Sequence, residues 1–315
     1  MTIDDNTVEV AETALVGEDP EEGVAQRRLG FGFWLAVSWL VLIVLLAVFA
    51  DVLPLKDPNE SFPRIGEVEN PITGNITEQQ IPGPFAPSSE HWLGADQLSR
   101  DVLSRTIHGA RISLVVGFAA ILFGMLVGGS TGMIAGFFGG KIDAVISFTY
   151  LVLLSFPALV LAILITALVD RSLFTIAMTL GILGIAPVGR LARAATLVFA
   201  ERDFVAAAKT IGAKRSRILL RELLPNVMIP MGALALLGMG VAIVAEGGLA
   251  FLGLSVEGQS TTWGKLILNG SGTEVLKDAP YVAMVPIGFL FLTVMSLNFA
   301  GDRLRDYFDV RELSL

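Results

Sequence analysis

Long apolar runs separated by short polar segments restrict this chain more than any other feature of its sequence. Several runs reach the ~20 residues that a helix needs to cross the hydrocarbon core of a bilayer. Inside a membrane every backbone polar group must find its partner within the protein, so runs of this kind fold as helices. The chain is 53% hydrophobic and 17% charged, whereas soluble domains are roughly 25% charged. The sequence therefore predicts an all-α integral membrane protein.

Six transmembrane helices are expected from these runs. They cover residues 30–50, 112–138, 144–168, 173–194, 226–245 and 281–300, and the last five form a core at 112–302. Around the spans we expect an acidic tail at 1–29, a proline-rich loop ending in an amphipathic segment at 51–111, and a polar C-terminal segment at 303–315. The tail has eight acids and no base in its first 22 residues, a composition typical of solvated extensions.

Basic residues indicate which side of the membrane each segment occupies, because short loops rich in Lys and Arg stay in the cytoplasm. Arg27 and Arg28 precede the first span, and Arg303 and Arg305 follow the last. The densest group lies around the segment 195–225, at Arg190, Arg193, Arg202, Lys209, Lys214, Arg215, Arg217 and Arg221. We therefore expect both termini and the segment 195–225 in the cytoplasm, and residues 51–111 outside.

The segment 195–225 has an unusual internal layout. An alanine-rich stretch from Asp203 to Thr210 favours a helix, and Gly212 follows it as glycines follow helix ends. A second, amphipathic piece runs to Leu224, and Pro225 opens the next apolar run. A helix of two turns is unstable alone in water, where about 12–15 residues are needed. Either the rest of the chain or a partner must therefore hold it.

Residues that could supply energy or catalysis are scarce. The chain has no cysteine and two histidines, which argues against disulfides, thiol nucleophiles and Cys or His metal sites. No phosphate-binding loop of the form G-x-x-x-x-G-K-[ST] occurs, so ATP is not expected to bind here. We predict a protein that is not an enzyme and holds no cofactor. Any uphill movement of solute must draw its energy from another subunit.

The segment 195–225 resembles the EAA loop of ABC-importer permeases. Val205-Ala206-Ala207-Ala208, Gly212 and Leu224-Pro225 carry the resemblance, with Ala206 where the family usually has Glu. In that family the loop contains a coupling helix that sits in a groove of the ATPase subunit. The resemblance therefore implies an ATPase-coupling role for Asp203, Ala206, Ala207, Ala208, Gly212 and Pro225.

Three further blocks are similar to the dipeptide, oligopeptide and nickel permease family of ABC importers (DppC/OppC-type subunit, binding-protein-dependent transport inner membrane component). They run from His91 to Leu114, from Glu246 to Leu254 and from Asn298 to Asp306, with Ser99 where the family usually has Gly. The resemblance implies the type I ABC importer permease fold in a prokaryotic plasma membrane. It also implies four partners: a homologous second permease, two ATPases that bind ATP and Mg, and an external solute-binding protein. Membrane lipid surrounds such a chain, and no nucleic acid is expected.

Di- or oligopeptides are the solutes that the resemblance favours, with nickel or another small solute as the alternative. A proton- or sodium-coupled carrier is a more distant alternative. Such carriers often show inverted repeats and carboxylates within the membrane, and this chain has no visible repeat and few such acids.

Two groups of residues within the spans allow two interpretations each. Gly124, Gly128, Gly132 and Gly136 recur every four residues on one helix face, where small residues let helices approach closely. This face packs either against the second permease or within the chain. Glu246 stands beside a glycine-rich stretch with Gly248 and Leu252. It either lines the outer translocation pathway together with those two residues or caps the half-helix that follows.

Overall fold

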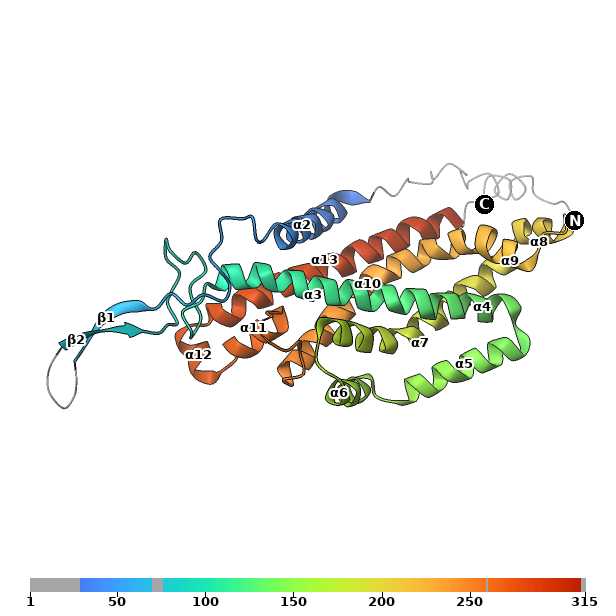
Figure 1. Cartoon of the computed structure of the whole chain (residues 1–315). Coiled ribbons are helices and arrows are strands. Elements are labelled where there is room, and N and C mark those ends of the chain that lie inside the picture. Colours follow the sequence, from blue (N-terminus) through green and yellow to red (C-terminus); the bar gives the residue numbers. More distant parts are fainter. Residues whose placement is uncertain (1–28, 70–75, 259, 313–315) are drawn as a thin grey trace, which may run out of the picture.

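Long helices lying side by side form a bundle in the computed structural model, which describes residues 29–69, 76–258 and 260–312 (Figure 1). The long helices are α2 (Gly30–Val48), α3 (Val102–Gly124), α4 (Ser130–Phe138), α5 (Gly140–Ser155), α6 (Ala158–Leu168), α7 (Leu173–Ala200), α10 (Leu224–Phe251) and α13 (Tyr281–Glu312). Shorter helices are α8 (Asp203–Thr210), α9 (Arg215–Arg217), α11 (Trp263–Gly270) and α12 (Thr273–Asp278). The acidic tail predicted at 1–29 lies outside the described residues except for its last position.

Two π-helical segments each join two α-helices into one continuous helical stretch. They are η1 (Met125–Gly129), which joins α3 to α4, and η2 (Ile218–Leu223), which joins α9 to α10. The resulting stretches run from Val102 to Phe138 and from Arg215 to Phe251. Both are longer than the spans predicted at 112–138 and 226–245. The amphipathic segment expected before the second span forms the first turns of its helix.

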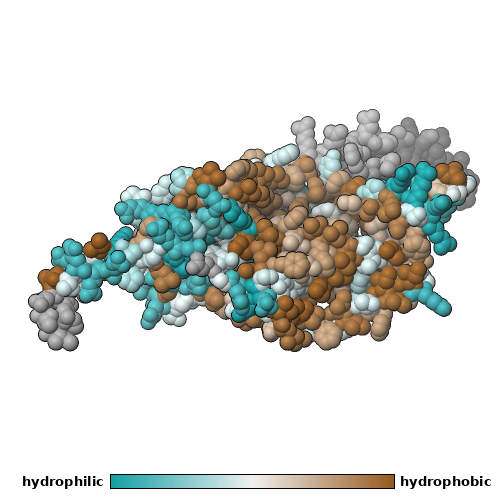
Figure 2. All heavy atoms as spheres, viewed as in Figure 1, coloured by the Kyte–Doolittle hydropathy of each residue, from teal (hydrophilic) through white to brown (hydrophobic). Residues whose placement is uncertain are grey.

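Membrane spans are evident from length and composition. Among the described residues, five helical stretches are long and apolar enough to cross a bilayer, and a sixth crossing results if α5 and α6 form one broken span. Figure 2 shows a broad hydrophobic band over the middle of the bundle, with hydrophilic residues gathered at both ends. This arrangement confirms a helical membrane protein. The end that carries α8 is called the α8 end below, and the opposite end the hairpin end.

Pro157 breaks the third predicted span. α5 ends at Ser155, α6 begins at Ala158, and their axes differ by 84°. Proline lacks the amide hydrogen that the helix needs, and its ring pushes the preceding residue out of the helical region. Phe156 accordingly has an extended backbone, with ψ of 134°. The single kinked helix expected at 144–168 is therefore corrected to two helices that meet at a sharp bend.

A β-hairpin projects from the hairpin end (Figure 1). Strands β1 (Arg64–Glu69) and β2 (Ile76–Ile81) pair antiparallel, with Arg64 opposite Ile81. Every residue of β2 is exposed, so the hairpin covers no core. An all-α fold was expected, and this two-stranded sheet is the departure from it within the described residues. Its strands show little of the apolar alternation that would identify them in the sequence.

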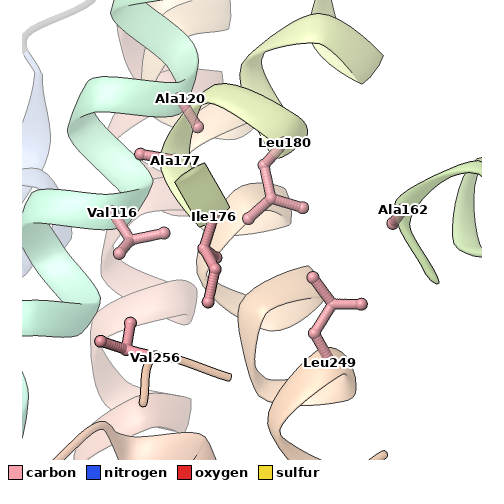
Figure 3. Packing of buried hydrophobic residues seen from close by; sticks show 8 residues of the cluster. All are labelled: Val116, Ala120, Ala162, Ile176, Ala177, Leu180, Leu249 and Val256. Atoms are coloured by element: carbon pink, nitrogen blue, oxygen red, sulfur yellow. The ribbon is translucent and has the colours of Figure 1, made fainter. Parts of the chain in front are cut away.

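Small and branched side chains fill the centre of the bundle at one level. Val116 and Ala120 of α3, Ile176, Ala177 and Leu180 of α7, Leu249 of α10 and Val256 form one buried cluster, with Ala162 of α6 at its side. Figure 3 shows the side chains of α3, α7 and α10 converging, while Ala162 approaches from the separate α6 ribbon. The cluster thus fixes the start of α7 and the end of α10 against α3.

The glycine row of α3, η1 and α4 packs against α7 of the same chain. A methyl group added at Gly128 or Gly132 would overlap backbone atoms of α7, and one at Gly136 would lie 2.8 Å from the carbonyl oxygen of Arg193. A methyl group at Gly124 would contact Gly184 at 3.5 Å. Because α7 occupies this face, it is closed to a second permease. Of the two interpretations of Gly124, Gly128, Gly132 and Gly136, these contacts support packing within the chain.

Trp263 fixes α11 at the hairpin end. Its indole is fully buried and donates from Nε1 to the carbonyl oxygen of Thr106 at 2.9 Å. Its amide donates to the hydroxyl oxygen of Ser113 at 3.1 Å. Both acceptors belong to α3, so α11 is anchored to the first turns of that helix. This contact defines one wall of the hairpin end.

Candidate functional site

One face of α8 is attached to the bundle. Val205 is completely buried and Ala208 nearly so, and both belong to a cluster with Ile218 and Leu223 of η2 and Met133 of α4. Burying a valine side chain contributes roughly 1.5–3 kcal/mol. The rest of the chain therefore holds this two-turn helix, which answers the question that its short length raised.

The chain reverses immediately after α8 through hydrogen bonds between backbone groups. The amide of Gly212 donates to the carbonyl oxygen of Lys209, and that of Ala213 to Ala208, both at 3.0 Å. These two bonds define the Schellman motif, in which the residue after the helix takes a left-handed conformation. Gly212 has φ of +78°, as this motif requires. The predicted glycine stop is confirmed.

The other face of α8 is open. Asp203, Ala206 and Ala207 are exposed, and Ile211 is 81% exposed. Phe204 is also exposed at 37%. Sequence reasoning missed Phe204 and Ile211. The signal for Phe204 was its place next to the buried Val205, since residues one apart on a helix face different directions. Ile211 lies just beyond the end of α8 at Thr210.

A recess borders this face and extends to η2. Its volume is about 530 Å³, and its walls come from Ile211–Lys214, Ser216, Arg217, Leu220 and Arg221. The predicted coupling residues separate here into two groups. Asp203, Ala206, Ala207 and Gly212 are exposed, whereas Ala208 faces the core and anchors the helix. Pro225 is exposed in the first turn of α10, beyond this recess.

Glu246 lies inside α10, where its side chain is 1% exposed. Its Oε1 accepts a hydrogen bond from the hydroxyl of Ser255 at 2.7 Å, and its Oε2 has no partner among the described residues. Thr262, not Glu246, caps α11 by accepting from the amide of Lys265. The sequence predicted a half-helix after Glu246, but α10 continues to Phe251, and this acid is neither exposed nor a helix cap.

Gly248 and Leu252 lie on the opposite side of α10 from Glu246. Both are exposed, and a methyl group added at Gly248 would contact nothing within 4 Å. On a helix of 3.6 residues per turn, side chains two and six positions after Glu246 point away from the side that Glu246 occupies. The three residues grouped as a pathway lining therefore occupy two different surfaces.

The family model for binding-protein-dependent transport system inner membrane components matches residues 106–313. This chain belongs to that family. The match confirms the family predicted from the sequence. It spans α7, α8 and α10 together with the open α8 face and Glu246.

Relatives of this inner membrane component carry names of peptide transport. The chain is 34% identical over 278 residues to the dipeptide transport system permease protein DppC of Alkalihalophilus pseudofirmus, covering 87% of this chain and 85% of the relative. It is 33% identical over 270 residues to the oligopeptide transport system permease protein OppC of Bacillus subtilis, covering 86% and 82%. Both likenesses extend beyond the residues that the family model matches.

A solved structure shows the same fold. The inward-facing MetNI methionine ABC transporter contains a chain that superposes with a TM-score of 0.54 at 18% sequence identity. The superposition covers 64% of this inner membrane component and 96% of that chain. The predicted type I ABC importer permease fold is confirmed.

Proposed function

We propose that this chain is the permease subunit of an ATP-driven importer for di- or oligopeptides. Two ATPase subunits bind ATP and Mg and supply the energy, a homologous permease completes the pathway, and an external binding protein delivers the peptide. The named relatives support peptides as the solute class. Family membership supports a binding-protein partner.

The open face of α8 is the observation that carries this proposal. α8 is anchored on one face by Val205 and Ala208, while Ala206, Ala207 and Ile211 are exposed to solvent. A rigidly held helix with an unoccupied surface can transmit a push from a partner to α4, α7 and α10, which share its buried cluster. Two-state rearrangement of packed helices is a common means of coupling. We therefore assign contact with an ATPase to Asp203, Ala206, Ala207 and Gly212, with Ala208 and Pro225 shaping the loop.

The α8 end faces the cytoplasm under this proposal. Lys209, Lys214, Arg215, Arg217 and Arg221 are all exposed there, and short basic segments stay inside. Both termini are then cytoplasmic, and the hairpin lies outside. The chain has no native cysteine, so single cysteines report the orientation. Asn59→Cys should react with an impermeant maleimide on intact cells, and Ser216→Cys should react only after lysis. The reverse pattern would overturn this orientation.

Transport by the reconstituted complex tests the function itself. The chain, its second permease, the ATPases and the binding protein are placed in liposomes with radiolabelled Ala-Ala or Ni²⁺. We expect Ala-Ala uptake that requires ATP hydrolysis and is absent with a non-hydrolysable ATP analogue. Uptake of Ni²⁺ in place of Ala-Ala would contradict the solute class. Uptake by the chain alone, driven by an ion gradient, would contradict the whole proposal.

A further inference from the structure

A recess at the hairpin end has the size of a small-molecule site. Its volume is about 460 Å³, and ligand pockets commonly measure 300–1,000 Å³. Its walls come from the start of α3, the α6–α7 turn, the end of α10 with the following loop, and α11. It lies at the opposite end of the bundle from the α8 face, and no residue predicted from the sequence as functional lines it.

Cations dominate the walls of this recess. Arg100, Arg105, Arg171 and Lys265 line it, and Glu257 is the one carboxylate among its lining residues. Two of these cations already form ion pairs with carboxylates. Arg100 pairs with Asp96 at 2.7 Å, and Arg171 pairs with Glu257 at 2.5 Å.

Arg105 and Lys265 are less completely satisfied. Arg105 is 4% exposed, and its Nη1 donates to the carbonyl oxygen of Pro58 at 2.7 Å. Among the described residues its Nε has no hydrogen-bond partner, and it lies 3.6 Å from the carboxylate of Asp96, which already binds Arg100. Lys265 donates only to the carbonyl oxygens of Gly258 and Ser260, and forms no ion pair with any described residue. A buried donor without a partner costs about 1–3 kcal/mol, which a ligand acceptor would recover.

The electrostatic surroundings favour an anion with a single charge. Burial lowers the pKa of Lys265, the charges of Glu246 and Glu257 act to raise it, and Arg105 and Arg171 act to lower it by repulsion. A bound anion would relieve this repulsion. Glu257 and Asp96 face the cations, and Glu246 lies behind Ser255, which itself lines the recess. Counted with these three acids, the four cations leave a formal excess of one positive charge, which a single carboxylate would neutralise.

We propose that this recess binds the carboxylate of a small solute through Arg105 and Lys265, with Arg100 and Arg171 held in place around them by their own acids. The proposal rests on the proposed import function, in which it provides a site on the permease for the free C-terminal carboxylate of a peptide. A recess of this volume suits a small molecule better than a protein partner, which would cover a flatter surface.

Binding of Ala-Ala to the complex without its binding protein tests the site directly. The complex of this chain, the second permease and the ATPases is held in lipid nanodiscs, and equilibrium binding of radiolabelled Ala-Ala is measured. Ala-Ala amide and inorganic phosphate serve as competitors. We expect the amide to compete at least fivefold less well than unlabelled Ala-Ala, because it lacks the carboxylate. Equal competition by the amide, or stronger competition by phosphate, would overturn the proposal.

Matched variants place the binding in the recess. Lys265→Gln should weaken Ala-Ala binding at least fivefold and abolish the preference over the amide. Lys277→Gln, an exposed lysine of α12 outside the recess, should leave both unchanged. Arg105→Lys keeps the charge but loses the donor Nε, and a twofold or greater loss of affinity is expected. Unchanged discrimination in Lys265→Gln would refute the assignment.

Two further measurements distinguish solute binding in the recess from docking of the solute-binding protein and from the import function itself. If Lys265→Gln weakens binding of the solute-binding protein and leaves the preference for Ala-Ala intact, the recess receives an acidic side chain of that protein, and the solute assignment is overturned. Uptake by the wild-type complex is measured separately. If the complex takes up Ala-Ala but the nanodisc assay shows no preference for Ala-Ala over its amide, only the carboxylate site in the recess is refuted. Failure of uptake refutes the import function, while the nanodisc assay still decides the carboxylate site.

Discussion

The amide of Ala213 donates to the carbonyl oxygen of Ala208 at 3.0 Å, so the chain turns back on α8 one residue after the helix ends. Gly212, between these two residues, holds φ of +78°. This bond fixes the direction in which the basic segment leaves the helix. It also couples the anchored face of α8, where Ala208 lies, to the open recess formed by Ile211–Lys214.

Gly212→Val should uncouple transport without removing the protein from the membrane. A methyl group at Gly212 would meet nothing within 4 Å, so any effect must come from the backbone. A left-handed conformation costs a residue with a side chain roughly 1–2 kcal/mol. We expect near-normal amounts of complex and a severalfold loss of peptide-stimulated ATP hydrolysis. Gly232→Val is the matched control, because Gly232 is also uncrowded but lies within α10 at ordinary φ. Equal loss in both variants would refute the role of the turn.

Val205→Asp should detach α8, whereas Ala206→Asp should be tolerated. Val205 is fully buried and its neighbour Ala206 is exposed, so the same acid is placed once in the core and once in solvent. A charge buried without a partner is far more costly than one in water. We expect rapid cleavage by trypsin in the basic segment of Val205→Asp and wild-type resistance in Ala206→Asp. Comparable cleavage of the two variants would contradict the observed orientation of α8.

Gly132→Ala should destabilise the chain, and Gly248→Ala should not. An added methyl group at Gly132 overlaps the backbone of α7, while at Gly248 it enters open space. Overpacking typically costs about 1–3 kcal/mol, and replacing glycine by alanine within a helix gains about 0.5–1 kcal/mol. Thermal unfolding of the full-length chain in detergent should therefore give a lower midpoint for Gly132→Ala and an unchanged or higher midpoint for Gly248→Ala. An unchanged midpoint for Gly132→Ala would mean that α4 and α7 are farther apart than in the structure.

Local patterns in the sequence predicted the spans, the short α8 and the stop at Gly212. Each of these depends on residues adjacent in the chain, such as an apolar run or a glycine after an alanine-rich stretch. The packing and hydrogen-bond partners of individual residues within the chain were harder to predict. The spacing of Gly128 and Gly132 revealed a face but not that α7 covers it. The hydrogen-bond partner of Glu246 is Ser255, which lies in the loop beyond α10.

The hairpin-end recess escaped prediction for the same reason. Arg105, Arg171 and Lys265 are far apart in the sequence. The packing of α11 on α3 through Trp263 and Thr106 brings Lys265 near Arg105, and the ion pair with Glu257 holds Arg171 beside them. Pro157 shows a different limit. Its effect on the helix was evident from the sequence, but the 84° angle depends on how α6 meets α7 and α10.

Ser99 offers the sharpest test of the hairpin end. It is fully buried, has φ of +58°, and its hydroxyl oxygen accepts from the amide of Gly83 at 2.6 Å. Ser99→Ala keeps the backbone strain and loses this acceptor, at about 1–3 kcal/mol. Ser99→Gly loses the same acceptor but relieves roughly 1–2 kcal/mol of strain. Thermal unfolding should therefore rank wild type and Ser99→Gly above Ser99→Ala, with the exposed Ser89→Ala as an unaffected control. Equal midpoints for Ser99→Ala and Ser99→Gly would show that residue 99 does not adopt the left-handed conformation.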